Sequence, residues 1–121
     1  MPDERQLGLL RDILDSGRRI TAYVGSSDET GFMADSEKQD AVLRRLEIIG
    51  EAASRLSTET RALFPELPFH GMRGMRNIIA HDYGEVDLEL VWRTATRDIP
   101  VLVATLDDYF GANDSAAHGS G

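Results

Sequence analysis

The chain has 121 residues, enough for one domain with a hydrophobic core, and its formal net charge is −8. The absence of cysteine excludes disulfides and thiolate zinc sites, and the acidic charge argues against broad nucleic-acid binding, which depends on many Lys and Arg contacts with phosphates. No apolar run approaches the roughly 18 residues of a membrane span and the polar N-terminus lacks a signal-peptide core, so we expect a cytoplasmic protein without membrane contacts.

The first predicted helix covers residues 3–24. Gly17 weakens its middle, because glycine is a poor helix former. The Gly/Ser-rich segment 25–31 that follows is predicted to be a loop. The helix prediction rests on apolar residues that recur at helical spacing: Leu7, Leu10, Ile13, Leu14, Ile20 and Val24.

The second predicted helix begins near Ser36, where Ser36 and Gln39 match the spacing of a capping box. Its apolar residues repeat at spacings of four and three and form a narrow seam for packing against another helix. Ser57 is expected to cap a short turn through Leu63, and prolines at 65 and 68 then break the chain. The seam residues are Val42, Leu46, Ile49, Ala53 and Leu56.

Residues 69–81 are predicted to be helical, with Met72, Met75, Ile78 and Ile79 on one face and Gly84 as the terminator. Asp87 is expected to cap the last long helix, which Pro100 should kink or restart. Its inward-facing residues are predicted to be Leu88, Val91, Trp92, Ala95, Ile99, Leu102 and Leu106.

Strand-like alternation is absent from the sequence, and the connections between the amphipathic segments are short. These features predict an all-α protein, an antiparallel up-and-down bundle of four to five helices. Residues 1–110 are expected to form this single domain. The small, polar, Gly/Ser-rich residues 111–121 are expected to form a flexible tail.

The segment 76–83 concentrates groups suited to phosphodiester chemistry. Arg76 supplies a planar cation that matches phosphate oxygens, and His81 can move protons near neutral pH. Residues 68–80 contain no acidic side chain but include His70, Arg73 and Arg76. We therefore expect a local positive site on an otherwise acidic body.

Helical geometry constrains how these groups can meet. Asn77 and His81 are four residues apart and share a helix face, so Asn77 can orient the imidazole. Arg76 and His81 are five apart, and their directions on a helix differ by about 140°. They converge on one ligand if the helix ends near His81, if Arg76 reaches round, or if two copies of the chain share one cleft.

The pattern Arg76-x4-His81-x-Tyr83 resembles the R-x4-H-x-Y signature of HEPN-domain ribonuclease toxins. The most similar branch is the HepT-like toxins, which are paired with a minimal nucleotidyltransferase antitoxin of the MntA type. Residues 46–52, 74–77, 86–92 and 98–100 also resemble that branch, so the likeness covers roughly residues 41–106.

The resemblance implies a dimeric helical bundle with the motif at the dimer cleft, and metal-independent RNA cleavage without a cofactor. It assigns Arg76 and His81 as the catalytic pair, with Asn77 as an orienting residue. It also implies a type VII-like toxin–antitoxin system, in which the antitoxin transfers AMP onto Tyr83 and silences the enzyme. The partners it implies are RNA, the antitoxin and a second copy of the chain.

Several alternatives stay open on the sequence. The chain could be a non-catalytic helical module that binds nucleotides or supports a nucleotidyltransferase. Arg73 either assists RNA binding or is simply exposed, and Asp82 is either solvated or tunes His81. Glu51, set in an apolar stretch, either pairs with an arginine near the site or faces water. A metal hydrolase is disfavoured, because the three histidines form no metal-spaced cluster.

Overall fold

The computed structural model describes residues 2–69, 72 and 86–119, with side chains described up to residue 112. Within these residues every regular element is helical, which confirms the predicted all-α bundle. No helix in the described part is long and apolar enough to cross a membrane. The elements are α1 (Glu4–Val24), α2 (Glu29–Met33), α3 (Ser36–Ser54), α4 (Thr58–Ala62), α6 (Leu88–Arg93), the π-helix η1 (Thr94–Asp98) and α7 (Ile99–Gly119).

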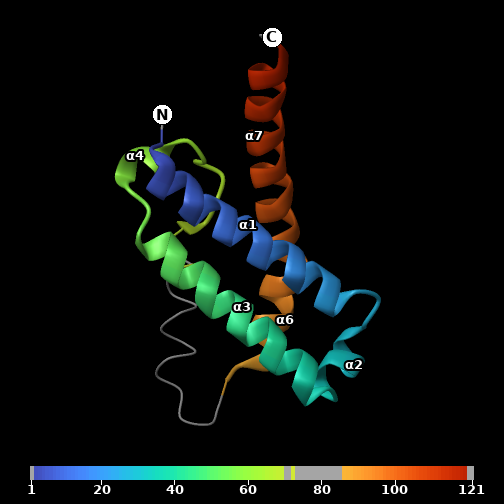
Figure 1. The fold of residues 1–121 in the computed structure, drawn as a ribbon. Helices are drawn as coiled ribbons and strands as arrows, with labels where there is room; N and C mark the ends of the chain where they lie inside the picture. Colours follow the sequence, from blue (N-terminus) through green and yellow to red (C-terminus); the bar gives the residue numbers. More distant parts are fainter. Residues whose placement is uncertain (1, 70–71, 73–85, 120–121) are drawn as a thin grey trace.

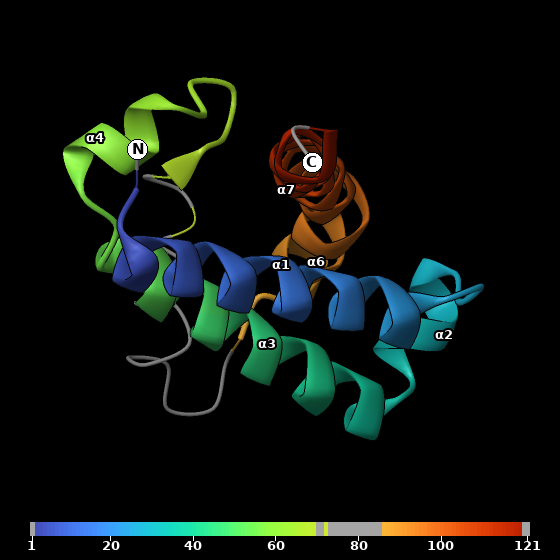
Figure 2. The ribbon, with the colours of Figure 1, turned by 45° about the horizontal axis from the view of Figure 1, so that its top comes forward.

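Helices α1 and α3 lie side by side and antiparallel, and the run formed by α6, η1 and α7 crosses behind them (Figures 1 and 2). Gln6 ties the start of α1 to the chain after α3: its side chain accepts a hydrogen bond from Ser57 N (2.8 Å) and donates one to Arg55 O (3.3 Å). The C-terminal turns of α7 project beyond the other helices (Figure 1).

The core forms where the predicted apolar stripes of these helices meet. The seam of α3 is buried throughout, and Leu46 is 2% exposed. The predicted face of α1 is also buried, except that Leu7 is only partly covered. Burial of such side chains is the main stabilising term of a small domain. From the last helical run the core takes Val91, Ala95, Ile99, Leu102 and Leu106.

Gly17 is where α1 and α7 approach most closely among the described glycines. A Cβ atom at this position would lie 2.9 Å from Val103 Cγ2, too close for an ordinary contact. Beside this contact, Arg18 pairs with Asp107 of α7, and the Arg11 guanidinium lies 5.0 Å from the centroid of the Phe110 ring. The glycine that weakens an isolated helix therefore permits close helix packing here.

Side chains cap the described helices largely as predicted. Ser57 Oγ accepts from Thr60 N at 3.1 Å, and Asp87 Oδ1 accepts from Leu90 N at 3.1 Å. The predicted box at Ser36 is wrong by one residue, because Asp35 is the cap and accepts from Lys38 N at 3.0 Å. Gln39 instead donates to the carbonyls of Phe32 and Met33 at the end of α2.

The predicted loop 25–31 also needs correction. Helix α2 begins at Glu29, capped by Asp28, whose side chain accepts from Gly31 N at 2.8 Å. Phe32 is fully buried and its ring lies 5.3 Å from that of Trp92, between centroids. Local composition indicated a loop, but the Asp28 cap and the burial of Phe32 stabilise one helical turn.

The last helical run changes geometry just before Pro100. Residues 94–98 form a π-helix, in which Ile99 N donates to Thr94 O, five residues back. The predicted restart therefore falls at Ile99, where α7 begins. The backbone of α7 is helical through Gly119. The flexibility expected of residues 111–121 stays a prediction.

Candidate functional site

The residues predicted to carry the chemistry all fall in one stretch of chain. Residues 73–85 lie outside the described residues, and so does residue 70. The structure therefore does not place any of the predicted site residues relative to one another. Those residues are Arg73, Arg76, Asn77, His81, Asp82 and Tyr83. The described residues at both ends of the stretch show how it is attached to the bundle.

The chain is anchored to the core just before this stretch. Phe69 is 8% exposed, and its ring lies edge-on to that of Phe64, with the centroids 6.5 Å apart. Phe64 also contacts Tyr109 of α7, at 5.1 Å between ring centroids. Met72 is buried in the core, and its backbone N–H donates to Pro68 O at 2.9 Å. These contacts hold residues 69 and 72, just before the predicted site, against the core.

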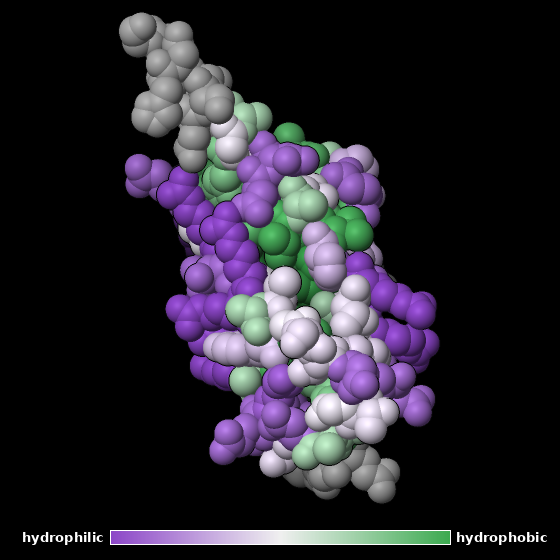
Figure 3. All heavy atoms as spheres, turned by 90° about the vertical axis from the view of Figure 1, so that its right-hand side faces the viewer, coloured by the Kyte–Doolittle hydropathy of each residue, from purple (hydrophilic) through white to green (hydrophobic). Residues whose placement is uncertain are grey.

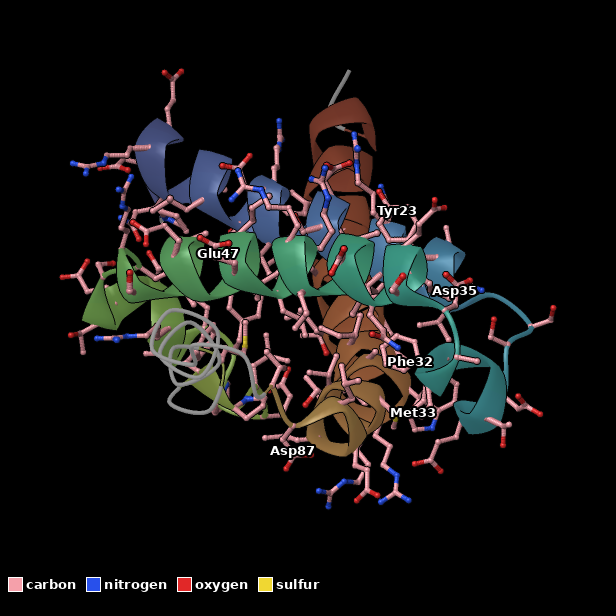
Figure 4. All side chains as sticks on the ribbon, turned by 90° about the horizontal axis from the view of Figure 1, so that it is seen from below. Tyr23, Phe32, Met33, Asp35, Glu47 and Asp87 are labelled. Carbon is pink, nitrogen blue, oxygen red and sulfur yellow. The ribbon has the colours of Figure 1, made fainter. Side chains whose placement is uncertain are left out.

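The chain is anchored again directly after the stretch. Val86 packs against the core as a partly buried side chain. Asp87, at the start of α6 (Figure 4), caps that helix with its side chain, and its backbone carbonyl accepts from Val91 N at 3.0 Å. The described residues on both sides of the range 73–85 are thus parts of the packed bundle.

The question left open for Glu51 has a structural answer. Its carboxylate lies 2.9 Å from Nη2 of Arg55, the C-cap residue of α3. The carboxylate is half exposed, at 41%, so solvent also reaches it. Glu51 therefore pairs with an arginine without being a buried charge, and such an exposed pair contributes little to stability.

A hollow beside α6 was not anticipated from the sequence. It has a volume of about 440 Å³ and lies where α2 meets α6 and η1. Trp92, predicted to face inward, is only partly buried and forms part of the wall. Two carboxylates line it beside two arginines, so it is not a purely basic phosphate site. The wall residues are Glu29, Glu89, Trp92, Arg93, Thr96 and Arg97.

In the described part of the chain, no group of three or more acidic side chains is arranged to hold a metal ion, and the three histidine side chains lie outside that part. Three protein ligands with an open position are the usual minimum for a catalytic zinc site.

Comparison with known proteins agrees with the helical architecture. The family described as "Ribonuclease HepT-like" matches residues 13–108, a range that contains the whole segment 73–85. The chain is 37% identical over 93 residues to "Probable ribonuclease HepT" of Thermococcus cleftensis, covering 77% of this chain and 84% of that protein.

A candidate RNase of Methanocaldococcus jannaschii is 36% identical over 93 residues, which cover 77% of this chain and 85% of the relative. A second candidate RNase of the same organism is 35% identical over 102 residues, covering 84% of this chain and 88% of the relative. No solved structure matches the chain significantly. The extent of the family match and of these relatives shows that the chain belongs to the HepT-like ribonuclease family.

Proposed function

We propose that the chain is a metal-independent endoribonuclease and the toxin of a type VII-like HEPN/nucleotidyltransferase toxin–antitoxin pair. The observation that carries this proposal is the sequence Arg76-x4-His81-x-Tyr83, which lies inside the region matched by the ribonuclease family. The names of the relatives, which describe them as ribonucleases, support RNA as the substrate.

In the proposed reaction the 2′-hydroxyl of RNA attacks the adjacent phosphorus. A bond forms between the 2′-oxygen and phosphorus while the bond to the 5′-oxygen breaks. The 2′-hydroxyl loses a proton and the leaving 5′-oxygen gains one; His81 transfers one of these two protons and water exchanges the other. Arg76 stabilises the negative charge that builds up on the phosphorane. Asn77 orients His81, and Arg73 and Asp82 support substrate binding and the proton carrier.

The core contacts at both ends of residues 73–85 support this reading. The chain is fixed at Met72 and again at Asp87, and both anchors are parts of the packed bundle. Preorganised groups on a supported segment stabilise a transition state better than groups that must be ordered during the reaction. We further propose that the enzyme acts in the cytoplasm as a homodimer.

The cleavage test uses purified chain and RNA in excess EDTA. We expect cleavage to persist, and to be lost separately in Arg76→Ala and His81→Ala, because each removes one part of the charge and proton machinery. Cleavage that disappears with EDTA would contradict metal independence. The alternative function, a non-catalytic helical module, predicts that no cleavage depends on these two residues.

Tyr83 is the proposed point of control. A nucleotidyltransferase partner would catalyse attack of the tyrosine oxygen on the α-phosphorus of ATP, with pyrophosphate as the leaving group. The attached AMP adds bulk and negative charge next to Arg76, which disfavours an RNA phosphate there. Intact-mass measurement after coexpression should show AMP adducts that Tyr83→Phe lacks. A partner that neutralises the wild-type chain without any adduct would rule out this control.

A further inference from the structure

The hollow beside α6 is bordered by charged side chains that pair with no other described residue. It has a volume of about 440 Å³, within the range of roughly 300–1,000 Å³ that small-molecule sites occupy. Its charged residues are all exposed, and none takes part in the ion pairs that the described residues form: Glu29, Glu89, Arg93 and Arg97. Two cations and two anions are therefore available to a ligand there.

Trp92 supplies an aromatic surface in this wall. Its ring lies 5.3 Å from that of Phe32, between centroids, at an interplanar angle of 39°. Phe32, labelled in Figure 4, is fully buried and belongs to α2. The Thr96 hydroxyl donates to the backbone carbonyl of Trp92 at 2.8 Å. The indole is thus held by the core while its uncovered part faces the hollow, and such a surface can stack on a nucleobase, since every base has an aromatic face.

The surroundings of the hollow distinguish it from an ordinary stretch of helix surface. Thr96 and Arg97 belong to the π-helix η1, and π-helices are rare in proteins and frequently found at functional sites. In Figure 3, which views the right-hand side of Figure 1, strongly apolar residues gather in the upper half, whereas the part at the height of α2 is mainly hydrophilic or intermediate. The surface near α2 therefore suits a polar ligand better than an apolar partner.

The mixed charge of the wall narrows the class of ligand. A bare phosphate ion would meet as many carboxylates as guanidinium groups, so the arginines alone do not make the hollow an anion site. A nucleotide offers a phosphate for the arginines, a base for the indole, and N–H and ribose O–H groups from which the carboxylates can accept hydrogen bonds. We infer that the hollow binds one unpaired nucleotide of the RNA substrate, with the base against Trp92 and the phosphate at Arg93 and Arg97.

This inference deepens the proposed function and rests on it for the identity of the RNA. The nucleotide must be unpaired, because a base inside a duplex is stacked on its neighbours and has its pairing edge occupied. One such site agrees with the net charge of −8, which permits a few phosphate contacts but not a grip on a long duplex. The α6 part of the wall begins at Glu89, four residues after the segment 73–85. The hollow therefore borders the helix that follows the proposed catalytic segment.

The first test measures binding without cleavage. Trp92 is the only tryptophan of the chain, so its fluorescence reports directly on the hollow. The probe is a short single-stranded RNA with methylated 2′-oxygens, which lacks the hydroxyl that the proposed reaction needs. At constant low salt we expect this RNA to change the fluorescence of the wild-type chain in a saturable way. Its duplex with a complementary strand, and inorganic phosphate alone, should have little effect.

Substitutions then locate the contact. Arg93→Gln and Arg97→Gln should each raise the dissociation constant of the single strand about 10-fold, because a charge-assisted contact with phosphate is lost. Arg5→Gln is the matched control, since it makes the same change at an exposed residue of α1 and should leave this constant unchanged. In cleavage assays Arg97→Gln should raise KM by a similar factor and leave kcat unchanged, because the hollow holds substrate and not the reacting atoms. Circular dichroism checks that every variant is folded.

Three results would overturn the inference. The single strand could leave the fluorescence unchanged, the duplex or inorganic phosphate could act equally well, or both hollow variants could bind RNA as Arg5→Gln does. None of these results depends on cleavage, so each would leave the ribonuclease proposal standing. A chain that binds the single strand through the hollow but never cleaves RNA would contradict the ribonuclease proposal alone.

Discussion

The helical bundle and the segment 73–85 differ in what their side chains can do. The bundle, formed by α1, α3 and the run from α6 to α7, buries its apolar stripes almost completely and forms ion pairs at its surface. The segment, by contrast, carries the cation, the imidazole and the phenol of the motif in its sequence. Under the proposed function, stability and chemistry reside in separate stretches of the chain. Substitutions in each stretch should therefore change a different measurement.

The largest effect is expected for His81→Ala. Removing a placed proton carrier should lower the cleavage rate about 10²–10⁴-fold, while the urea midpoint of unfolding stays near the wild-type value. His70→Ala is the matched control, because it removes a histidine eleven residues earlier without touching the motif. The two variants are compared with the wild type by the initial rate at which each cleaves a labelled RNA. Similar losses in both variants would show that the motif spacing has no special role.

The next effect is a loss of stability in the bundle. Leu46 is 2% exposed, and Leu46→Ala should lower the free energy of unfolding by about 2–5 kcal/mol through lost burial and a cavity. Leu63→Ala truncates a leucine that is 47% exposed. This variant should change the free energy of unfolding by about 0.5 kcal/mol or less. Urea unfolding measures both. Equal changes in the two variants would contradict the assignment of Leu46 to the core.

A smaller effect separates two glycines of the same helix. Gly17→Ala places a Cβ 2.9 Å from Val103 Cγ2, whereas a Cβ at Gly8 has no atom within 4 Å. Overpacking costs about 1–3 kcal/mol and exceeds the gain of about 1 kcal/mol from replacing helical glycine by alanine. We expect Gly17→Ala to destabilise the fold and Gly8→Ala to stabilise it. A stabilising Gly17→Ala would mean that α1 and α7 can separate without cost.

The smallest effect is expected for two helix caps, one far from the segment 73–85 in the sequence and one next to it. Asp35→Ala and Asp87→Ala remove equivalent caps, with hydrogen bonds of 3.0 and 3.1 Å, and each should lower stability by about 1 kcal/mol. Only Asp87 lies close to the segment 73–85 in the sequence, so only Asp87→Ala should also slow cleavage. Cleavage rates are compared without urea, at equal concentrations of folded variant and folded wild type. Equal cleavage rates in the two variants would show that the Asp87 anchor does not position the motif.

The sequence predicted the bundle well wherever local pattern and packing agreed. The stripe of α3 and the caps at Ser57 and Asp87 are confirmed, because one apolar face and one oxygen-bearing cap are enough to define a helix. The errors came from tertiary contacts. Gln39 bonds the carbonyls at the end of α2 instead of closing a capping box, and buried Phe32 holds a helical turn inside a loop-like composition.

The site was predicted from the residues of the motif and from resemblance, not from packing. Arg76 and His81 are five residues apart, and three arrangements can bring them together: a helix end near His81, a long reach of Arg76, or a second subunit. The spacing alone does not distinguish these arrangements. The roles of Arg76, His81 and Tyr83 stay predictions. The hollow lined by Trp92 and Arg97 was missed, because it forms only where α2 meets α6 and η1 in the folded chain.

The most direct test of the separation between bundle and motif is a crossed measurement on His81→Ala and Leu46→Ala. Both variants are assayed for RNA cleavage in EDTA at a temperature where circular dichroism shows them folded, and for unfolding in urea. The predicted result is a stable but inactive His81→Ala and a destabilised Leu46→Ala that cleaves at the wild-type rate per folded molecule. Cleavage retained by His81→Ala, or lost by folded Leu46→Ala, would contradict this account.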